Sequence, residues 1–191
     1  MRKNRVYRLA NFVGLLCAGC ASSTPSLSQS ATTRLVPASA LSLQDESQVA
    51  ARLLAVHNRE RAAAGVPPLR WDPALAAAAA AYGPSLAAAG RLVHSSRTGR
   101  PNQSENLWMG TRGAYSPEQM VGSWASERAM FRPGIFPNVS STGNWLDVAH
   151  YTQMIWRSTN AVGCAIYSSR SWDYLICRYS PRGNRDGQRV P

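Results

Sequence analysis

Two short segments near the C-terminus constrain the fold more than any other part of this sequence. VGCAIYSS and WDYLICRYS each alternate apolar and polar residues, as strands with one buried face do, and residues 169–171 between them suit a turn. An antiparallel hairpin centred on that turn places Cys164 opposite Cys177 and Ile166 opposite Leu175. We therefore expect a terminal hairpin with a cross-strand disulfide, and a pair of packed reduced thiols is the alternative.

The segment 45–65 has the spacing of an amphipathic helix. Its apolar residues Val49, Leu53 and Val56 recur at intervals of three or four, and Gly65 is suited to the helix C-terminus. The residues VPPLRW then predict a loop.

Two further helices carry clear start signals. Asp72-Pro73 combines an N-cap with a proline at the first helical position, and the alanine-rich run that follows extends to Gly90. Ser116 and Gln119 have the spacing of a capping box, which opens a helix that we expect to continue to about Phe131. The alanine side chains give the first of these helices a slim profile that suits close packing.

The remaining segments complete a mixed fold. Residues 131–145 predict a loop of unusual length with several apolar side chains, and residues 150–156 predict a short helix. A third strand is expected at about 105–110. Helices followed by a terminal hairpin predict an α+β sandwich with a small antiparallel sheet.

The N-terminus predicts export. Residues 1–20 pair the basic MRKNRVYR with an apolar run that is too short for a permanent membrane span, as in a secretory signal. The sequence LCAGC resembles a bacterial lipoprotein box, in which Cys20 becomes the lipidated first residue. Ordinary cleavage after Ala21 is the alternative. Export places Cys164 and Cys177 in a compartment that permits disulfides.

The rest of the chain divides into three parts. The Ser/Thr/Pro-rich segment 21–45 has too little apolar content to fold and predicts a flexible tether. A folded domain is expected over residues 46–184, followed by a C-terminal tail, residues 185–191. The protein is therefore expected in the outer membrane or periplasm, or released outside the cell, with a lipid anchor as its only membrane attachment.

The basic charge does not predict a nucleic-acid partner. The chain has 21 basic and 10 acidic residues, a net charge of +11, and all but one of the basic residues are arginines. The arginines are scattered, without a dense run or an aromatic-interleaved repeat, and four basic residues lie in the first eight positions.

Four ionisable residues lie in apolar surroundings, and they are the candidate functional residues. They are His94, Glu105, Glu127 and His150. Burying a carboxylate or an imidazole without a partner costs several kcal/mol. One shared polar cleft is more economical than four separate buried sites.

Several motifs, in order and spacing, resemble those of one family. HNRERAAAGVPPLRWDPALAAAAAAYG, SENLWMG, AHYTQMIWRSTNAVGCAI and YLICRYSPRGN are similar to successive motifs of the CAP superfamily, over about residues 48–184. That superfamily includes cysteine-rich secretory proteins, insect venom antigens and group 1 pathogenesis-related proteins. The resemblance implies an α-β-α sandwich. It also implies a central cleft lined by His94, Glu105, Glu127 and His150.

The sequence departs from the family pattern at several positions. Ser104 stands where the family usually has glycine before Glu105, and Val148-Ala149 replaces a common Cys-Gly pair. Most family disulfides are therefore missing. His57 matches a family position at the first helix, outside the four cleft residues, and we expect it to be structural.

The cleft residues suggest a metal site. Imidazole nitrogen and carboxylate oxygen suit Zn²⁺ and related divalent ions, and family members bind metal in this cleft. Glu105 and Glu127 would act as ligands or would orient His94 and His150. A metal-free network of His–Glu hydrogen bonds is the alternative.

Two classes of function follow from the same residues. The first is a non-enzymatic module that binds a lipid, an envelope component or a host protein, with the apolar 131–145 loop beside its pocket. The second is a metal-dependent peptidase or esterase that uses Glu105 or Glu127 as general base, with Ser95 as a candidate nucleophile. Neither Gly-x-Ser-x-Gly nor His-Glu-x-x-His occurs in the sequence.

Overall fold

The structure is a computed structural model that describes residues 38–191. The expected signal peptide, the lipidation site Cys20 and residues 21–37 of the expected tether lie outside these residues. Within the described part of the chain, no helix is both long enough and apolar enough to cross a membrane.

Four α-helices and four main strands make up the domain. The helices are α1 (Ala38–Ala63), α2 (Pro73–Ala89), α3 (Pro117–Ala125) and α4 (Ala149–Met154), with 3-10 turns η1 (Ser126–Ala129) and η2 (Trp145–Val148). The strands are β1 (Arg70–Trp71), β2 (Ser104–Thr111), β4 (Ala161–Ser168) and β5 (Trp172–Ser180). A separate two-stranded sheet contains β3 (Gly134–Ile135) and β6 (Arg189–Val190).

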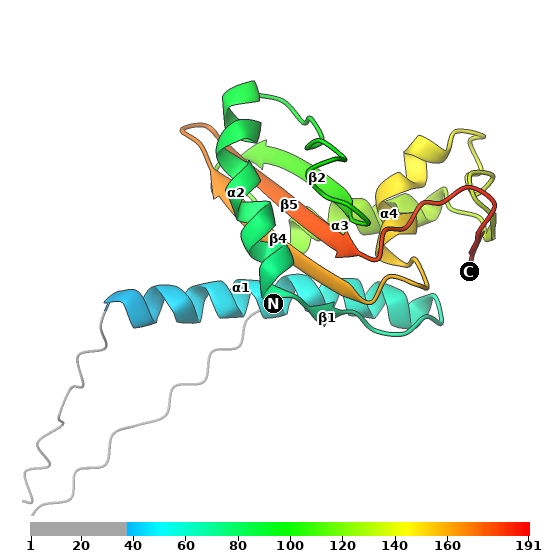
Figure 1. Cartoon of the computed structure of the whole chain (residues 1–191), viewed down its shortest axis with the longest axis horizontal. Coiled ribbons are helices and arrows are strands. Elements are labelled where there is room, and N and C mark those ends of the chain that lie inside the picture. Colours follow the sequence, from blue (N-terminus) through cyan, green and yellow to red (C-terminus); the bar gives the residue numbers. More distant parts are fainter. Residues whose placement is uncertain (1–37) are drawn as a thin grey trace, which may run out of the picture. The chain divides into compact units, whose positions relative to one another are not determined.

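The main sheet has the order β1-β4-β5-β2 (Figure 1). The β4–β5 hairpin has the register predicted from the sequence, with Cys164 opposite Cys177 and Ile166 opposite Leu175. The expected third strand is β2, which pairs antiparallel with β5. The expected α+β class is confirmed, but the sheet is mixed, because β1 pairs in parallel with β4.

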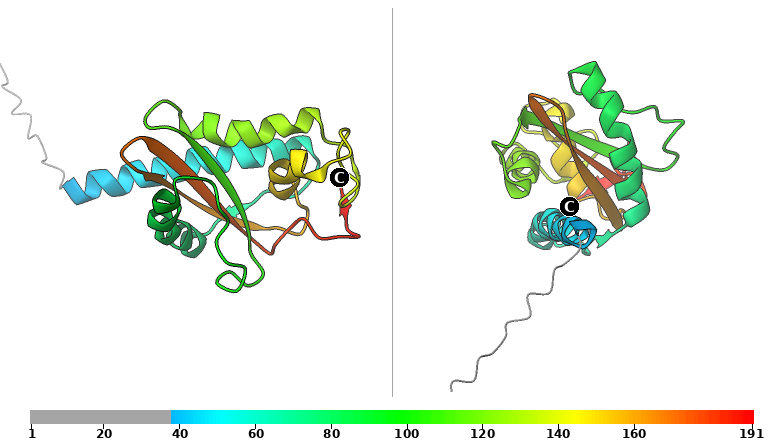
Figure 2. Two further views of the ribbon diagram at one scale, coloured as in Figure 1. Left: turned by 90° about the horizontal axis from the view of Figure 1, so that it is seen from above. Right: turned by 90° about the vertical axis from the view of Figure 1, so that its left-hand side faces the viewer.

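Helices cover both faces of the sheet, which confirms the expected α-β-α sandwich (Figure 2). Strand β5 is buried on both faces, and its side chains alternate between two apolar clusters. Leu175, Cys177 and Tyr179 belong to the larger cluster with α1, α3 and α4. Tyr174 and Ile176 pack on the other face, against α2.

The predicted helix caps are present. The Asp72 side chain accepts hydrogen bonds from the first turn of α2, and Gly90 ends that helix in the left-handed conformation at φ 63°. Ser116 and Gln119 form the predicted capping box at the start of α3. The α-helical part of α3 ends at Ala125, and η1 continues the chain where the sequence suggested α-helix.

Close contact between α2 and β4 requires a glycine. A Cβ atom at Gly163 would lie 2.3 Å from the backbone nitrogen of Ala76. The small side chains of α2 therefore allow its backbone to lie directly on the strand, as the alanine-rich sequence suggested.

Two expected boundaries are wrong. Helix α1 begins at Ala38, within the segment 21–45 that we expected to be a tether, because the alanine and leucine residues there are good helix formers. The C-terminal residues 185–191 are not a free tail. Strand β6 pairs with β3, and Val190 is fully buried because the 131–145 loop offers it an apolar site.

The Cys164–Cys177 disulfide is present, with sulfurs 2.04 Å apart. Replacing both cysteines with alanine is expected to lower the free energy of unfolding by about 3 kcal/mol, because the bond closes a loop in the unfolded chain. Urea denaturation of the oxidised protein and the variant measures this loss. A loss below about 1 kcal/mol would show that packing, rather than the covalent bond, holds these strands together.

Candidate functional site

The four candidate residues form two His–Glu pairs. In the first pair, Nδ1 of His94 lies 3.0 Å from a carboxylate oxygen of Glu105. His94 is in the loop after α2, where its side chain is 56% exposed, and Glu105 is on β2 with its side chain fully buried. In the second pair, Nδ1 of His150 on α4 lies 2.6 Å from an oxygen of Glu127 in η1.

Glu105 is surrounded by hydrogen-bond donors. Its oxygens accept from the backbone N–H of Ser95 at 2.9 Å and from the Ser95 hydroxyl at 2.7 Å. The guanidinium of Arg178, its cross-strand neighbour on β5, lies 3.6 Å away. Burial acts to raise the pKa of Glu105, but hydrogen bonds from His94 and Ser95 and the charge of Arg100 bring it below its ordinary value. Glu105 is therefore ionised at neutral pH.

Glu127 fixes the position of His150 through both backbone and ring. One carboxylate oxygen accepts from the backbone N–H groups of His150 and Tyr151, both at 3.0 Å, at the start of α4. The other oxygen holds the His150 ring. The His150 imidazole also stacks on the ring of Trp124 in α3, with the ring centroids 5.8 Å apart.

These contacts leave one nitrogen of each imidazole available. The ionised carboxylate of Glu105 can only accept, so Nδ1 of His94 carries the hydrogen of that bond. Glu127 orients the Nδ1 side of His150 in the same manner. In the neutral ring the remaining nitrogen, Nε2, is then an acceptor or a metal ligand. Neither Nε2 atom has a hydrogen-bond partner among the residues that the structure describes.

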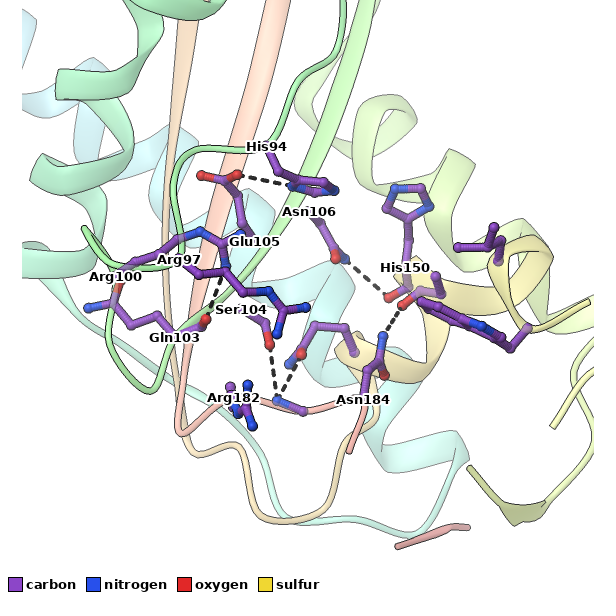
Figure 3. A pocket seen from close by; sticks show the side chains of 15 residues that line it. His94, Arg97, Arg100, Gln103, Ser104, Glu105, Asn106, His150, Arg182 and Asn184 are labelled. Carbon is purple, nitrogen blue, oxygen red and sulfur yellow. Dashed lines mark hydrogen bonds and ion pairs between the residues drawn. The ribbon is translucent and has the colours of Figure 1, made fainter. Parts of the chain in front are cut away.

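Both histidines line one pocket of about 260 Å³ (Figure 3). Its other walls come from the loop before β2, from η2 and α4, and from the segment after β5. The lining residues are His94, Arg97, Arg100, Gln103, Ser104, Glu105, Asn106, Trp145, Leu146, Ala149, His150, Gln153, Arg182, Gly183 and Asn184. Glu127 lies behind His150 and is not part of the lining.

Several residues of the pocket floor were not anticipated from the sequence. The backbone N–H of Gly183 donates to Gln153 at 2.9 Å and to the Ser104 hydroxyl at 3.1 Å. Asn184, with φ 49°, donates from its side chain to the carbonyl of Ala149. The only sequence signals were their places in the motifs HYTQ and SPRGN. Ser104, which replaces a common glycine, therefore has a bonding role.

His57 lies outside the pocket, in the core. It is fully buried, its Nδ1 contacts the carbonyl of Leu53, and its Nε2 contacts the Tyr179 hydroxyl at 2.8 Å. Burial lowers the pKa of His57 to about 4. Asn106 links this network to the cleft, because its amide donates to Tyr179 and to the carbonyl of His150.

The geometry limits what the two carboxylates can do. Both oxygens of each glutamate already accept hydrogen bonds, and the Ser95 hydroxyl donates to Glu105 rather than to an imidazole. Within residues 38–191, no group of three or more His, Cys, Asp or Glu side chains could hold a metal ion. The four residues expected as one metal set are thus two imidazoles, each held by its own carboxylate.

The 131–145 loop contributes to both the core and the pocket. Phe136 is buried and packs against the rings of Trp145 and Trp156. Trp145 itself is 37% exposed and lines the pocket with Leu146, which is 59% exposed. The loop therefore provides the apolar wall of the cleft.

The domain is a three-layer sandwich with two imidazoles, each held by a carboxylate, beside one cleft. The sequence matches the model of the cysteine-rich secretory protein family, CAP, over residues 54–179. The chain belongs to this family. Relatives include a PR-1-type pathogenesis-related protein of Sambucus nigra, 37% identical over 135 residues (70% of this chain, 76% of the relative). Pathogenesis-related protein 1 of Arabidopsis thaliana is 38% identical over 132 residues (69% and 75%).

A solved structure shares the fold. The crystal structure of NaASP2 with Zn²⁺ superposes with a TM-score of 0.62 over 75% of this chain and 85% of that chain, at 21% identity. Membership of a family of secretory proteins supports export, as the N-terminal sequence predicted.

Proposed function

We propose that the protein is a non-enzymatic binding module outside the cytoplasm, and that its cleft holds a divalent metal ion, such as zinc, between His94 and His150. The observation that carries this proposal is the pairing of each Nδ1 with a carboxylate, which directs both rings and leaves both Nε2 atoms available. A carboxylate behind a metal-binding histidine is a common arrangement, and it increases the basicity of the ligand.

The chemistry of the two imidazole donors suits a zinc ion. Imidazole nitrogen is a preferred zinc ligand, and two histidines leave further coordination positions for water or a bound ligand. Glu105 and Glu127 would orient the rings rather than coordinate, since hydrogen bonds occupy their oxygens. The Zn²⁺ in the NaASP2 structure belongs to that protein and adds circumstantial support. When bound, the ion supplies a Lewis-acidic centre that takes up an oxygen or nitrogen donor of a ligand.

A hydrolase is the weaker candidate. A general base must lie within hydrogen-bond reach of the proton that it removes. Glu127 does not line the pocket, and Glu105 is saturated by donors. This arrangement favours binding over turnover.

Attachment and lipid binding extend the proposal. Acylation of Cys20 would anchor the exported domain to a membrane, and the expected tether would place the cleft at a distance from it. Trp145 and Leu146 offer an apolar surface beside the polar floor, which suits a lipid or an apolar part of an envelope or host partner.

Calorimetric titration of Zn²⁺ into the purified protein at pH 7 tests the metal site. One ion per chain is expected to bind. The double variant His94→Ala/His150→Ala is expected to bind more than about 100-fold more weakly, or about 2.8 kcal/mol, because both nitrogen ligands are gone.

The two imidazoles are partly exposed, so the double variant can be compared with the unaltered chain as a folded protein. The side chains of His94 and His150 are 56% and 33% exposed, so the double variant should still fold. Its thermal unfolding midpoint should fall, because Glu105 and Glu127 each lose a hydrogen bond and Trp124 loses its stacked ring. Zinc binding that survives in a folded double variant would overturn the metal proposal and leave the two pairs as a structural network.

A further inference from the structure

The pocket holds more positive than negative charge. Three arginines line it, Arg97, Arg100 and Arg182. Among the described lining residues, Glu105 is the one carboxylate, and it is already bonded to His94 and Ser95. In Figure 3, Arg97 and Arg100 are on the left of the pocket, Arg182 is below, and His150 is on the right.

Two of these arginines have no protein partner. The guanidinium groups of Arg97 and Arg182 make no hydrogen bond or ion pair with any other residue in the part of the chain that the structure describes. Both residues are exposed. Backbone bonds fix their positions, from Arg100 N–H to the Arg97 carbonyl and from Arg182 N–H to the Asn102 carbonyl. These bonds fix the backbone from which both side chains line the pocket, and no described residue neutralises the two charges there.

Arg100 adds a fixed charge beside them. It is 8% exposed, and it donates to the carbonyls of Ser95 and Gln103 at 3.2 and 3.1 Å. Burial lowers the pKa of Arg100, the charge of Glu105 raises it, and the neighbouring charges of Arg97 and Arg178 lower it again. The positive charges in this region repel one another, and one glutamate does not balance them.

We propose that the cleft binds the oxyanion of an acidic ligand, a phosphate or a carboxylate group, through Arg97 and Arg182. Guanidinium groups present pairs of N–H donors that match the oxygens of these anions, so two unpaired arginines at one pocket suit this class of ligand. The proposal deepens the proposed function by naming the ligand chemistry. It rests on the same cleft but does not require the metal.

The apolar part of the lining defines the rest of the ligand. Trp145 and Leu146 are exposed at the same pocket, and a tryptophan face favours an apolar or ring-shaped group. The pocket therefore suits a small acid with an apolar portion more than a bare inorganic ion. Phenyl phosphate combines the two features and fits a volume of about 260 Å³ better than a long chain would.

Titration of inorganic phosphate and of phenyl phosphate into the full chain tests the proposal. The protein is first stripped of metal and then dialysed free of the chelator, so that failure of the metal site cannot affect the result and no carboxylate competes with the probes. Phenyl phosphate is expected to bind more tightly than phosphate. The double variant Arg97→Gln/Arg182→Gln is expected to bind each probe about tenfold or more weakly, because hydrogen bonds to a charged group are lost.

A charge-matched control separates a site from general attraction. Arg112→Gln/Arg170→Gln removes the same two charges from exposed positions outside the pocket, and it should leave both affinities within about twofold, because charges beyond a Debye length are screened. Equal weakening by both double variants would overturn the proposal. Failure of phenyl phosphate to bind the unaltered chain would overturn it as well.

A binding experiment with lipid vesicles shows whether the oxyanion belongs to a lipid headgroup or to a free acid. The chain without an acyl group at Cys20 is mixed with phosphatidylglycerol vesicles and, separately, with phosphatidylcholine vesicles. Binding to the first alone, lost in Arg97→Gln/Arg182→Gln, assigns the oxyanion to a lipid headgroup. Binding of phenyl phosphate without vesicle binding supports a free acid instead. Vesicle binding that ignores the arginine substitutions contradicts the proposal for lipids.

Discussion

Replacing Arg61 with alanine is expected to lower the free energy of unfolding by about 4 kcal/mol, because the substitution leaves several buried carbonyl groups without a donor. Arg61 is on α1, and its side chain is fully buried. It donates to the carbonyls of Met154 and Trp156 at 2.9 Å, and to those of Thr159 and Pro67 at 2.9 and 2.6 Å.

These bonds hold the end of α4 and the approach to β4 against α1. The last carbonyls of a helix have no partner within the helix, so a buried helix end needs a donor from elsewhere. Burial lowers the pKa of Arg61 to about 10, with a smaller contribution from the charge of Arg157. At neutral pH, Arg61 is therefore a buried cation that is neutralised by backbone dipoles alone, with no ion pair to any described residue.

Urea denaturation followed by circular dichroism measures the loss. Arg59→Ala is the matched control, since the Arg59 side chain is 65% exposed and its loss should cost less than about 1 kcal/mol. Arg61→Lys keeps the charge, but a lysine cannot reach all four carbonyls. Its free energy of unfolding should therefore lie between those of Arg61→Ala and the unaltered protein. If Arg61→Ala and Arg59→Ala are equally stable, water replaces the guanidinium and the buried bonds contribute little.

Arg61 also illustrates what the sequence could not predict. Its partners lie as far as 98 positions along the chain and are backbone carbonyls, which every sequence contains. No residue type marks them. The same holds for β1, a two-residue strand within an expected loop. Its parallel partner β4 comes much later in the chain, after α4.

Local signals were more informative. The caps at Asp72 and Ser116 and the register of the Cys164–Cys177 hairpin follow from short-range chemistry, and the structure confirms all three. Sequence also identified the four ionisable residues, but not their division into pairs. That division depends on η1, a 3-10 turn where the sequence suggested a continuing α-helix. Because of this turn, Glu127 lies at the start of α4.

Replacing Glu105 with glutamine is expected to lower the free energy of unfolding by about 3 kcal/mol at pH 7, because it leaves a buried arginine unpaired. Arg178 is 7% exposed, and its Nε already has no partner among the described residues. Glutamine also places an amide N–H₂ group where Glu105 accepts from His94 or Ser95. The substitution is isosteric, so a cavity does not add to the effect.

The same variant should also lower the affinity of the cleft for a metal ion. His94 loses the carboxylate that fixes its ring, and loss of such a partner typically costs about 10- to 100-fold in metal affinity. Glu46→Gln removes the same charge from an exposed position of α1, so it should change stability by less than about 0.5 kcal/mol and leave zinc binding intact.

The pH dependence of the stability difference isolates the charge. The pKa of Glu105 is lower in the folded protein than its ordinary value of 4.5, so its contribution is fully present above that value. The contribution is lost as the pH falls through the lower, folded-state pKa. The free energies of unfolding of the unaltered chain and of Glu105→Gln should therefore differ most above about pH 5 and converge in stronger acid. His57, which stays neutral in the folded state down to about pH 4, affects both chains alike. A difference that stays constant from pH 7 to pH 3 would show that Glu105 stabilises the fold by shape rather than by its charge.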